Sequence, residues 1–153
     1  MSYCTVQEAD EYVSTHYLST DEIRGTWESL DEDSKQILLN RGEQVIDNLP
    51  LSGRKYDMAQ PNAFPRNCSP DVPNEVKFAE VELALAYSDS DSLQIQDEYK
   101  RMVDYGISSY SIGNFSESIL TYGKGSLQMK YGLISTQAER YLSAWLSGGF
   151  CVV

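Results

Sequence analysis

The stretch that decides the fold runs from Gln60 to Tyr87 and reads QPNAFPRNCSPDVPNEVKFAEVELALAY. Its first half holds four of the chain's five prolines: Pro61, Pro65, Pro70 and Pro73. Each proline restricts its own φ and biases the preceding residue toward extended backbone, so this half is predicted to be a loop. The second half is apolar on more than one side of a helix. We therefore predict a central helix from Pro73 to Tyr87 that is packed from two directions.

The predicted Pro-rich loop, residues 50–73, is longer than most connections inside a compact domain. Such a loop is usually functional or packed down by its own side chains. Phe64 is the candidate anchor of this loop. Arg66 can pair with carboxylates or carbonyls, and we predict that it fixes the loop or bridges subunits through an ion pair with the acidic N-terminal half.

The chain has 153 residues, of which 41% are hydrophobic, and this is enough for one domain, residues 1–153, with its own core. No apolar run approaches the length of a membrane span, and the first residues lack the pattern of a signal peptide, so synthesis in the cytoplasm is expected. The net charge of −11 is uneven: residues 1–50 carry −8, residues 51–100 carry −4 and residues 101–153 carry +1. The acidic half disfavours tight wrapping of nucleic acid, whereas the nearly neutral last third can meet a partner surface.

Residues that commonly carry catalysis are few. His16 is the single histidine, and no serine, cysteine or carboxylate spacing around it indicates a catalytic group. The acidic runs Asp31–Asp33 and Asp89–Asp91 lack the glycine and glutamate of a calcium loop, and the glycines form no phosphate-binding pattern. Three widely spaced cysteines favour reduced thiols over a disulfide framework: Cys4, Cys68 and Cys151. We expect no enzymatic activity, no metal and no cofactor.

Start signals for helices mark the N-terminal third. Thr5 to Glu8 forms a capping box, and Ser19 to Glu22 repeats the signal for a short helix. Asp31–Asp33 places negative charge at the first turn of a third helix, predicted to run to about Asn48. Gly42 lies inside this helix at a cost of about 1 kcal/mol, and close approach of another helix is one reason for it.

The rest of the chain is predicted to combine helix, hairpin and tail. Leu93–Asp104 has a helical pattern and completes a helical core over residues 1–104. Two β-prone runs flank Gly113-Asn114, which predicts a β-hairpin over residues 105–122. Residues 135–146 form the last predicted helix, and residues 147–153 form an apolar tail. The predicted fold class is mainly α, a bundle of four to five helices with a β-hairpin insertion and an extended C-terminal tail.

Short motifs follow one another along most of residues 3–146: Tyr3-x-Thr5-x-x-Glu8-Ala9-Asp10-x-Tyr12, Trp27, Ile46-Asp47, Gly53-Arg54-Lys55, Phe64-Pro65-Arg66, Val72-Pro73, Val76, Ala79 and Glu82-Leu83-Ala84. Ile107 to Ser116 and Ala138 to Leu142 continue the series. Their order and spacing resemble the head–tail adaptor, or head-completion, proteins of tailed bacteriophages. Members of this family are often labelled DnaT-like single-stranded-DNA-binding proteins.

The resemblance implies a structural virion protein without catalysis. Its copies would form a homododecameric ring at the head–tail interface, docked on the portal protein and joined to the next neck, stopper or tail protein. Genomic double-stranded DNA would pass through the ring without specific binding, and no membrane is involved. The alternative, which the label implies, is a replication accessory protein that binds single-stranded DNA.

Within that role, the neutral C-terminal third is the candidate for portal docking, through Tyr141, Trp145, Phe150, Val152 and Val153. The hairpin is the candidate for contacts between subunits or with the neck, because exposed strand edges can pair with another chain. Its candidate residues are Ile107, Tyr110, Ile112, Gly113, Asn114 and Phe115.

Overall fold

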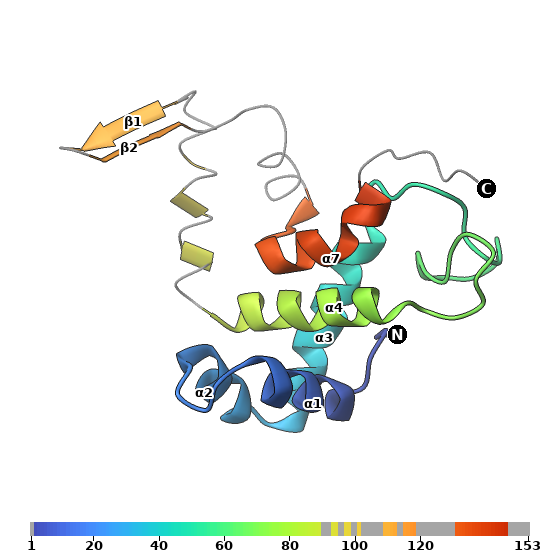
Figure 1. Cartoon of the computed structure of the whole chain (residues 1–153), viewed down its shortest axis with the longest axis horizontal. Helices are drawn as coiled ribbons and strands as arrows, with labels where there is room; N and C mark the ends of the chain where they lie inside the picture. The colour runs from blue at the N-terminus through green and yellow to red at the C-terminus, as the bar shows by residue number, and fades with distance from the viewer. Residues whose placement is uncertain are drawn as a thin grey trace.

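A computed structural model of the chain describes residues 2–89, 93–94, 97–98, 101, 109–112, 115–118 and 131–146. Its helices and strands follow the order α1 (Val6–His16), α2 (Glu22–Glu28), α3 (Glu32–Asp47), α4 (Asn74–Ser88), β1 (Ser109–Ile112), β2 (Phe115–Ser118) and α7 (Thr136–Leu146) (Figure 1). The class is mainly α, as predicted. Within the described residues, no helix has the length and apolar character needed to cross a membrane.

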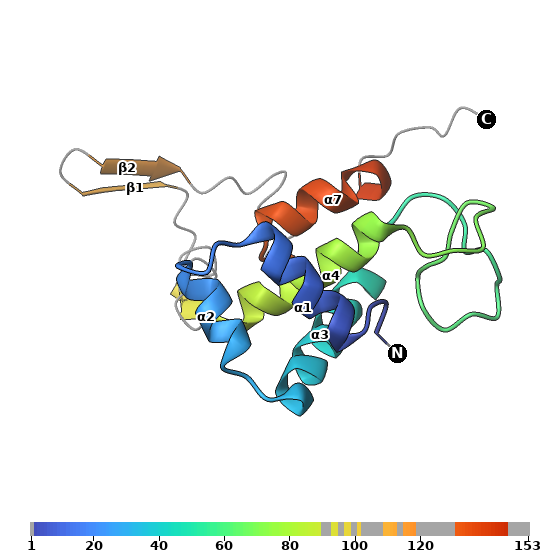
Figure 2. The ribbon, with the colours of Figure 1, turned by 60° about the horizontal axis from the view of Figure 1, so that its bottom comes forward.

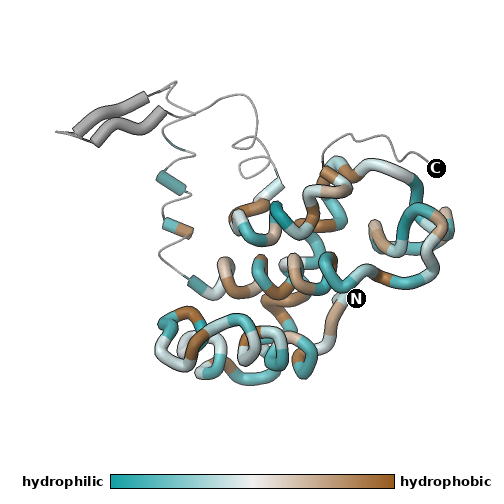
Figure 3. Tube along the Cα trace, in the orientation of Figure 1, coloured by the Kyte–Doolittle hydropathy of each residue, from teal (hydrophilic) through white to brown (hydrophobic). Residues whose placement is uncertain are grey.

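Helix α4 lies at the centre of the fold. It packs on α3 and α7, and it also contacts α1 and α2 (Figures 1 and 2). Two hydrophobic clusters share it: Val76, Ala79 and Leu83 belong to one, whereas Val81, Ala84 and Leu85 belong to the other. Hydrophobic residues recur along α4 and α7, as expected of helices that share a core (Figure 3). The prediction of a helix packed from two directions is confirmed.

Gly42 of α3 lies close against the backbone of α4. A Cβ atom at this position would lie 2.8 Å from the backbone oxygen of Glu80 and 3.4 Å from Cβ of Leu83. A side chain at residue 42 would therefore force α3 and α4 to shift apart. This explains a glycine in a helix interior, where its conformational freedom is unfavourable.

The helix starts follow the sequence signals with one exception. At α1, Glu8 N donates to Thr5 Oγ1 at 3.2 Å and Thr5 N donates to the Glu8 carboxylate at 2.7 Å, which is the predicted capping box. The start predicted at Ser19 is wrong, because α2 begins only after Asp21. A turn closes first: Asp21 N donates to Leu18 O, and Leu18 N donates to the Asp21 carboxylate at 2.8 Å.

The segment between α4 and α7 is described in part. The backbone is helical at Leu93–Gln94, at Asp97–Glu98 and at Arg101, within the predicted helix 93–104. Strands β1 and β2 pair antiparallel, with Ile112 opposite Phe115, and stand apart from the helices in both views (Figures 1 and 2). The predicted turn residues Gly113 and Asn114 and the predicted tail, residues 147–153, lie outside the described residues.

Candidate interaction surfaces

Residues 51–73, here called the long loop, extend beyond the helices in both views (Figures 1 and 2). The two limbs of the loop pair with each other. Lys55 and Arg66 form an antiparallel bridge, Tyr56 N donates to Pro65 O at 3.0 Å, and Asn67 N donates to Arg54 O at 2.9 Å. The long loop is therefore an ordered element with its own backbone pairing.

Gln60 organises the inside of the long loop. Its side-chain amide donates to Asn62 O at 3.0 Å and to Pro65 O at 2.9 Å, while its side-chain oxygen accepts from Asp57 N at 3.0 Å. Lys55 Nζ donates to the carbonyls of Gln60 and Pro61 at 3.3 and 3.2 Å. These contacts satisfy backbone groups that a loop otherwise leaves to water.

Phe64 holds the base of the long loop in the core. Its side chain is 2% exposed and meets the rings of Tyr3 and Trp145 edge-on, with centroids 6.0 and 5.1 Å away. Ser52 N also donates to Trp145 O at 2.8 Å, so both limbs of the loop reach α7. This places Phe64 where the sequence predicts an anchor.

Arg66 binds backbone carbonyls of the long loop. Its guanidinium donates hydrogen bonds to four of them, those of Leu51, Ser52, Gly53 and Ala63, at 2.7 to 3.2 Å. Burial lowers the pKa of this guanidinium. The contacts that Arg66 makes with described residues thus bind the loop through carbonyls and not through the predicted ion pair with a carboxylate. Bridging to another subunit stays a prediction.

The tip of the long loop presents apolar side chains to solvent. Met58 is 83% exposed and Tyr56 is 54% exposed. Arg54 lies close by in sequence and is also exposed. Large apolar groups held outward by an ordered loop are typical of contact surfaces, because binding then requires little further ordering.

A second surface, here called the aromatic groove, lies between α1 and the first half of α4. It has a volume of about 340 Å³. Its lining includes Glu8, Glu11, Tyr12, Thr15, His16, Lys77, Phe78 and Val81. The rings of Tyr12 and Phe78 lie 4.9 Å apart, and His16 stacks on Tyr12 at 4.0 Å. The groove thus combines an aromatic floor with charged side chains at its rim.

A buried carboxylate fixes the aromatic groove from below. Glu82 is 6% exposed and accepts hydrogen bonds from the hydroxyls of Tyr12, at 2.6 Å, and Tyr17, at 2.9 and 2.8 Å. The hydroxyls of Tyr12 and Tyr141 lie 3.1 Å apart. Burial, together with the neighbouring Glu82 carboxylate, raises the pKa of both Tyr12 and Tyr17, which keeps these hydroxyls as donors. The groove is therefore pre-formed.

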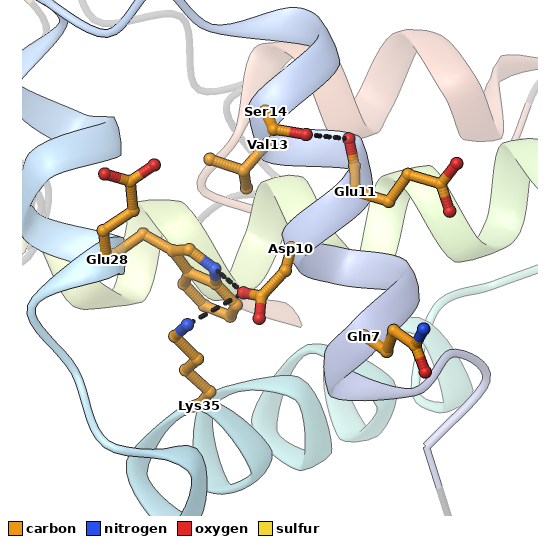
Figure 4. Close-up of a pocket in the computed structure, with 8 residues that line it drawn as sticks. Gln7, Asp10, Glu11, Val13, Ser14, Glu28 and Lys35 are labelled. Carbon is orange, nitrogen blue, oxygen red and sulfur yellow. Dashed lines mark hydrogen bonds and ion pairs between the residues drawn. The ribbon is translucent and has the colours of Figure 1, made fainter.

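A third hollow, of about 560 Å³, is lined by α1, Trp27 and Glu28 of α2, and Lys35 of α3 (Figure 4). Asp10 is the central group. It accepts from Trp27 Nε1 at 2.8 Å and from Lys35 Nζ at 2.8 Å (Figure 4). Lys35 also lies 5.4 Å from the centre of the Trp27 ring. The contacts of Asp10 with Trp27 and Lys35 hold α1, α2 and α3 together. Because these polar groups already bind one another, they are not available to bind a ligand in the hollow.

Sequence analysis did not predict the role of Glu80, which is fully buried in α4. Its carboxylate accepts from Tyr3 N at 3.1 Å, from Cys4 N at 2.9 Å and from Ser2 Oγ at 2.9 Å. The N-terminal segment is thereby fixed on the central helix. The signal was present as acidic residues at 80 and 82 within an otherwise apolar run, since a buried acid needs partners.

The predicted docking residues are placed in part. Tyr141 and Trp145 are half-buried and pack against the core, whereas Phe150, Val152 and Val153 lie outside the described residues. In the hairpin, Tyr110, Ile112 and Phe115 lie in β1 and β2, and Ile107 is outside the described residues. Among the described residues, the structure thus places Tyr141 and Trp145 on one helix, α7, and pairs Ile112 with Phe115 in the hairpin.

No group of three His, Cys, Asp or Glu side chains that could hold a metal ion occurs in the described part of the chain. His16 Nδ1 lies 2.9 Å from Tyr12 O, a contact within its own helix. Cys4 is buried and Cys68 is exposed. Burial and the nearby Glu80 carboxylate raise the pKa of the Cys4 thiol, which disfavours a reactive thiolate.

A family model described as "Putative DnaT-like ssDNA binding protein" matches residues 1–144. The matched range includes the long loop, the aromatic groove and most of α7. Neither the curated proteins nor the solved structures contain a match to the chain.

Proposed function

The chain belongs to the family described as "Putative DnaT-like ssDNA binding protein", and on that premise we propose that it is a structural virion protein, a phage head–tail adaptor. Its copies form a homododecameric ring that docks on the portal and connects the DNA-filled head to the neck or tail. The order and spacing of the motifs from Tyr3 to Leu142, which resemble those of phage head–tail adaptors, support this role. The role requires no catalysis and no cofactor.

The observation that carries this proposal is the long loop. It is anchored at its base by Phe64, bound internally by Gln60 and Arg66, and it exposes Tyr56 and Met58 at its tip. Such an element has the properties of an assembly contact: its own hydrogen bonds order it, and it presents apolar side chains to solvent at its end. Rigid elements lose little conformational entropy when a partner binds.

The charge of the chain is consistent with a DNA channel. The net charge is −11, and residues 1–50 account for −8 of it. An acidic ring around passing double-stranded DNA repels phosphates and prevents tight binding, so the DNA slides through. The partners are therefore other proteins: further copies of the chain, the portal, and the downstream neck, stopper or tail protein.

Two further parts have roles in this proposal. The C-terminal segment, with Tyr141 and Trp145 on α7 and the tail 147–153, docks on the portal. The hairpin 105–122 contacts neighbouring subunits or the neck, because the edges of β1 and β2 can add strands from another chain. The half-buried positions of Tyr141 and Trp145 leave part of each ring for a partner.

Electron microscopy of the chain mixed with its portal protein tests the proposal. We expect a ring of density on the portal face that meets the neck. Removal of residues 147–153 should leave the helical domain folded, as measured by circular dichroism, and abolish docking. Portals that stay bare with the full chain would overturn the adaptor role, and docking by the truncated chain would overturn the assignment of the tail.

A second candidate, single-stranded DNA binding, is favoured by the family description. The aromatic groove supplies rings on which bases can stack, and Lys77 lies at its rim. Lys77, however, pairs with Glu8 at 2.8 Å, and Glu11 adds a further negative charge. A mobility-shift titration at low salt decides between the two: tight, salt-sensitive binding favours the DNA-binding role, and its absence favours the adaptor.

A further inference from the structure

Met58 and Tyr56, at the tip of the long loop, are two of the four large hydrophobic residues that are most exposed in the described part of the chain. The loop extends away from α1 and α4, so its tip does not fill the aromatic groove of its own chain (Figures 1 and 2). From this arrangement we infer that the loop tip of one copy docks into the aromatic groove of a second copy. The inference rests on the proposed ring for its biological setting and names the contact that builds it.

The size and chemistry of the groove suit this occupant. Its volume of about 340 Å³ exceeds that of a single large side chain, so one loop tip can enter it. Tyr12 and Phe78 form the floor, and Val81 adds an aliphatic wall. A methionine thioether packs favourably against aromatic rings, and its unbranched chain adapts to an irregular groove.

The charges of the two surfaces are complementary. The long loop carries three basic and two acidic residues, a net +1, within a chain of net −11. The rim of the groove carries Glu8 and Glu11 against Lys77, a net −1. Lys55 and Arg66 donate to carbonyls within the loop, so the exposed Arg54 is the basic group near the tip that the net −1 of the rim can attract.

The contact is heterologous, because the loop and the groove are different surfaces of the same chain. Each copy can therefore give its loop to one neighbour and receive the loop of another. Repetition of such a contact closes into a ring or continues as a filament, depending on the rotation between neighbours. The loop is already ordered, and the groove is held by Glu82, so both sides are pre-formed for binding.

Two variants separate the halves of the contact. Met58→Asp places a charge on the loop tip, and Thr15→Arg fills the groove from an exposed position on α1. Sedimentation velocity at up to about 1 mM, the range of weak specific contacts, measures association. We expect the wild-type chain to associate and each variant to bind roughly ten- to thirty-fold more weakly, as for a central interface residue.

An equimolar mixture of the two variants is the decisive sample. It contains one intact loop, on Thr15→Arg, and one intact groove, on Met58→Asp, so it should form a dimer and nothing larger. Matched controls are Leu18→Asp, a charge at another exposed hydrophobic position, and Ser14→Arg, whose hydroxyl donates to Glu11 O as that of Thr15 does but which lies outside the groove. Both controls should associate as the wild type does.

A wild-type chain that stays monomeric at these concentrations would overturn the inference. So would association that Met58→Asp and Thr15→Arg leave unchanged, or a mixture that forms no dimer although both variants have wild-type circular dichroism. Failure of the adaptor role looks different: the chain and the mixture associate as expected, while the portal stays bare. Docking of unassociated copies on the portal would instead retain the adaptor role and reject the loop–groove contact.

Discussion

Phe64 of the long loop meets Trp145 of α7 edge-on, with ring centroids 5.1 Å apart and ring planes at 86°. The hydrogen bond from Ser52 N to Trp145 O joins the same two elements at 2.8 Å. The base of the loop and the last helix are thus parts of one packed unit.

Phe64→Ala should lower the free energy of unfolding by about 3–5 kcal/mol, the usual cost of removing a buried aromatic ring. The reason is that the ring is 2% exposed and contacts both Tyr3 and Trp145. Urea denaturation followed by tryptophan fluorescence measures the change. Tyr56→Ala is the control, because it removes an aromatic ring from the same loop at a 54% exposed site. Its free energy of unfolding should stay within about 0.5 kcal/mol of the wild-type value. Equal losses in the two variants would show that Phe64 is no anchor.

Gly42→Ala should destabilise the chain by about 1–3 kcal/mol, as overpacking does, although alanine favours a helix. The new Cβ would lie 2.8 Å from the backbone oxygen of Glu80, which cannot move without α4. Gly25→Ala is the matched control, since its Cβ would meet nothing within 4 Å in α2. The free energy of unfolding of Gly25→Ala should rise by roughly 0.5–1 kcal/mol, because alanine favours a helix more than glycine does. Thermal denaturation of both variants compares them, and a stabilised Gly42→Ala would contradict the close approach.

The sequence was sufficient to predict the central helix, the capping box at Thr5 and the anchor position of Phe64. Each of these depends on residues that are near in sequence or on the periodicity of one helix. Apolar periodicity identifies a buried face without knowledge of what covers it. Proline spacing likewise identifies a loop without giving its path.

The partners of buried polar groups could not be predicted. Glu80 binds the backbone of Tyr3 and Cys4, and Glu82 binds Tyr12 and Tyr17, all more than sixty residues away. Such pairs exist only once α1 lies on α4. The carbonyls that accept hydrogen bonds from Arg66 are brought to it by the path of the loop. The sequence does not give this path, so a carboxylate partner was expected instead. The aromatic groove arises from the same packing of α1 on α4.

Loss of the tyrosine hydroxyls above Glu82 should be costly and non-additive. Tyr17→Phe removes the donor at 2.9 and 2.8 Å and should cost about 1–3 kcal/mol, because a buried carboxylate is left with fewer hydrogen bonds. Tyr12→Phe should cost a similar amount. The loss of unfolding free energy in the double variant should differ from the sum of the two single losses by at least about 0.5 kcal/mol, since both hydroxyls bind one carboxylate. A denaturation cycle measures this coupling, and strict additivity would show that the hydroxyls act independently.

Stability should fall as the pH rises toward neutral because of Glu80. Burial raises the pKa of this carboxyl from 4.5 to about 7, despite hydrogen bonds from Ser2, Tyr3 and Cys4 that favour the charged form. The folded chain therefore binds more protons than the unfolded chain between these two pH values. The contribution of Glu80 to the free energy of unfolding is fully present below about pH 4.5. It is lost as the pH rises through about 7, and the loss is on the order of 3 kcal/mol.

Comparison with Glu80→Gln isolates this contribution, because glutamine does not titrate. The unfolding free energy of each protein is measured from pH 4 to pH 8. The difference between wild type and variant should decrease with rising pH by the amount predicted for Glu80. The absolute stability of the variant is no test, since its amide cannot accept from every donor that the carboxylate serves. Glu75→Gln, at an exposed position in the first turn of the same helix, should leave the wild-type profile unchanged. If the profiles of wild type and Glu80→Gln run parallel, the N-terminal segment is held independently of the charge on Glu80.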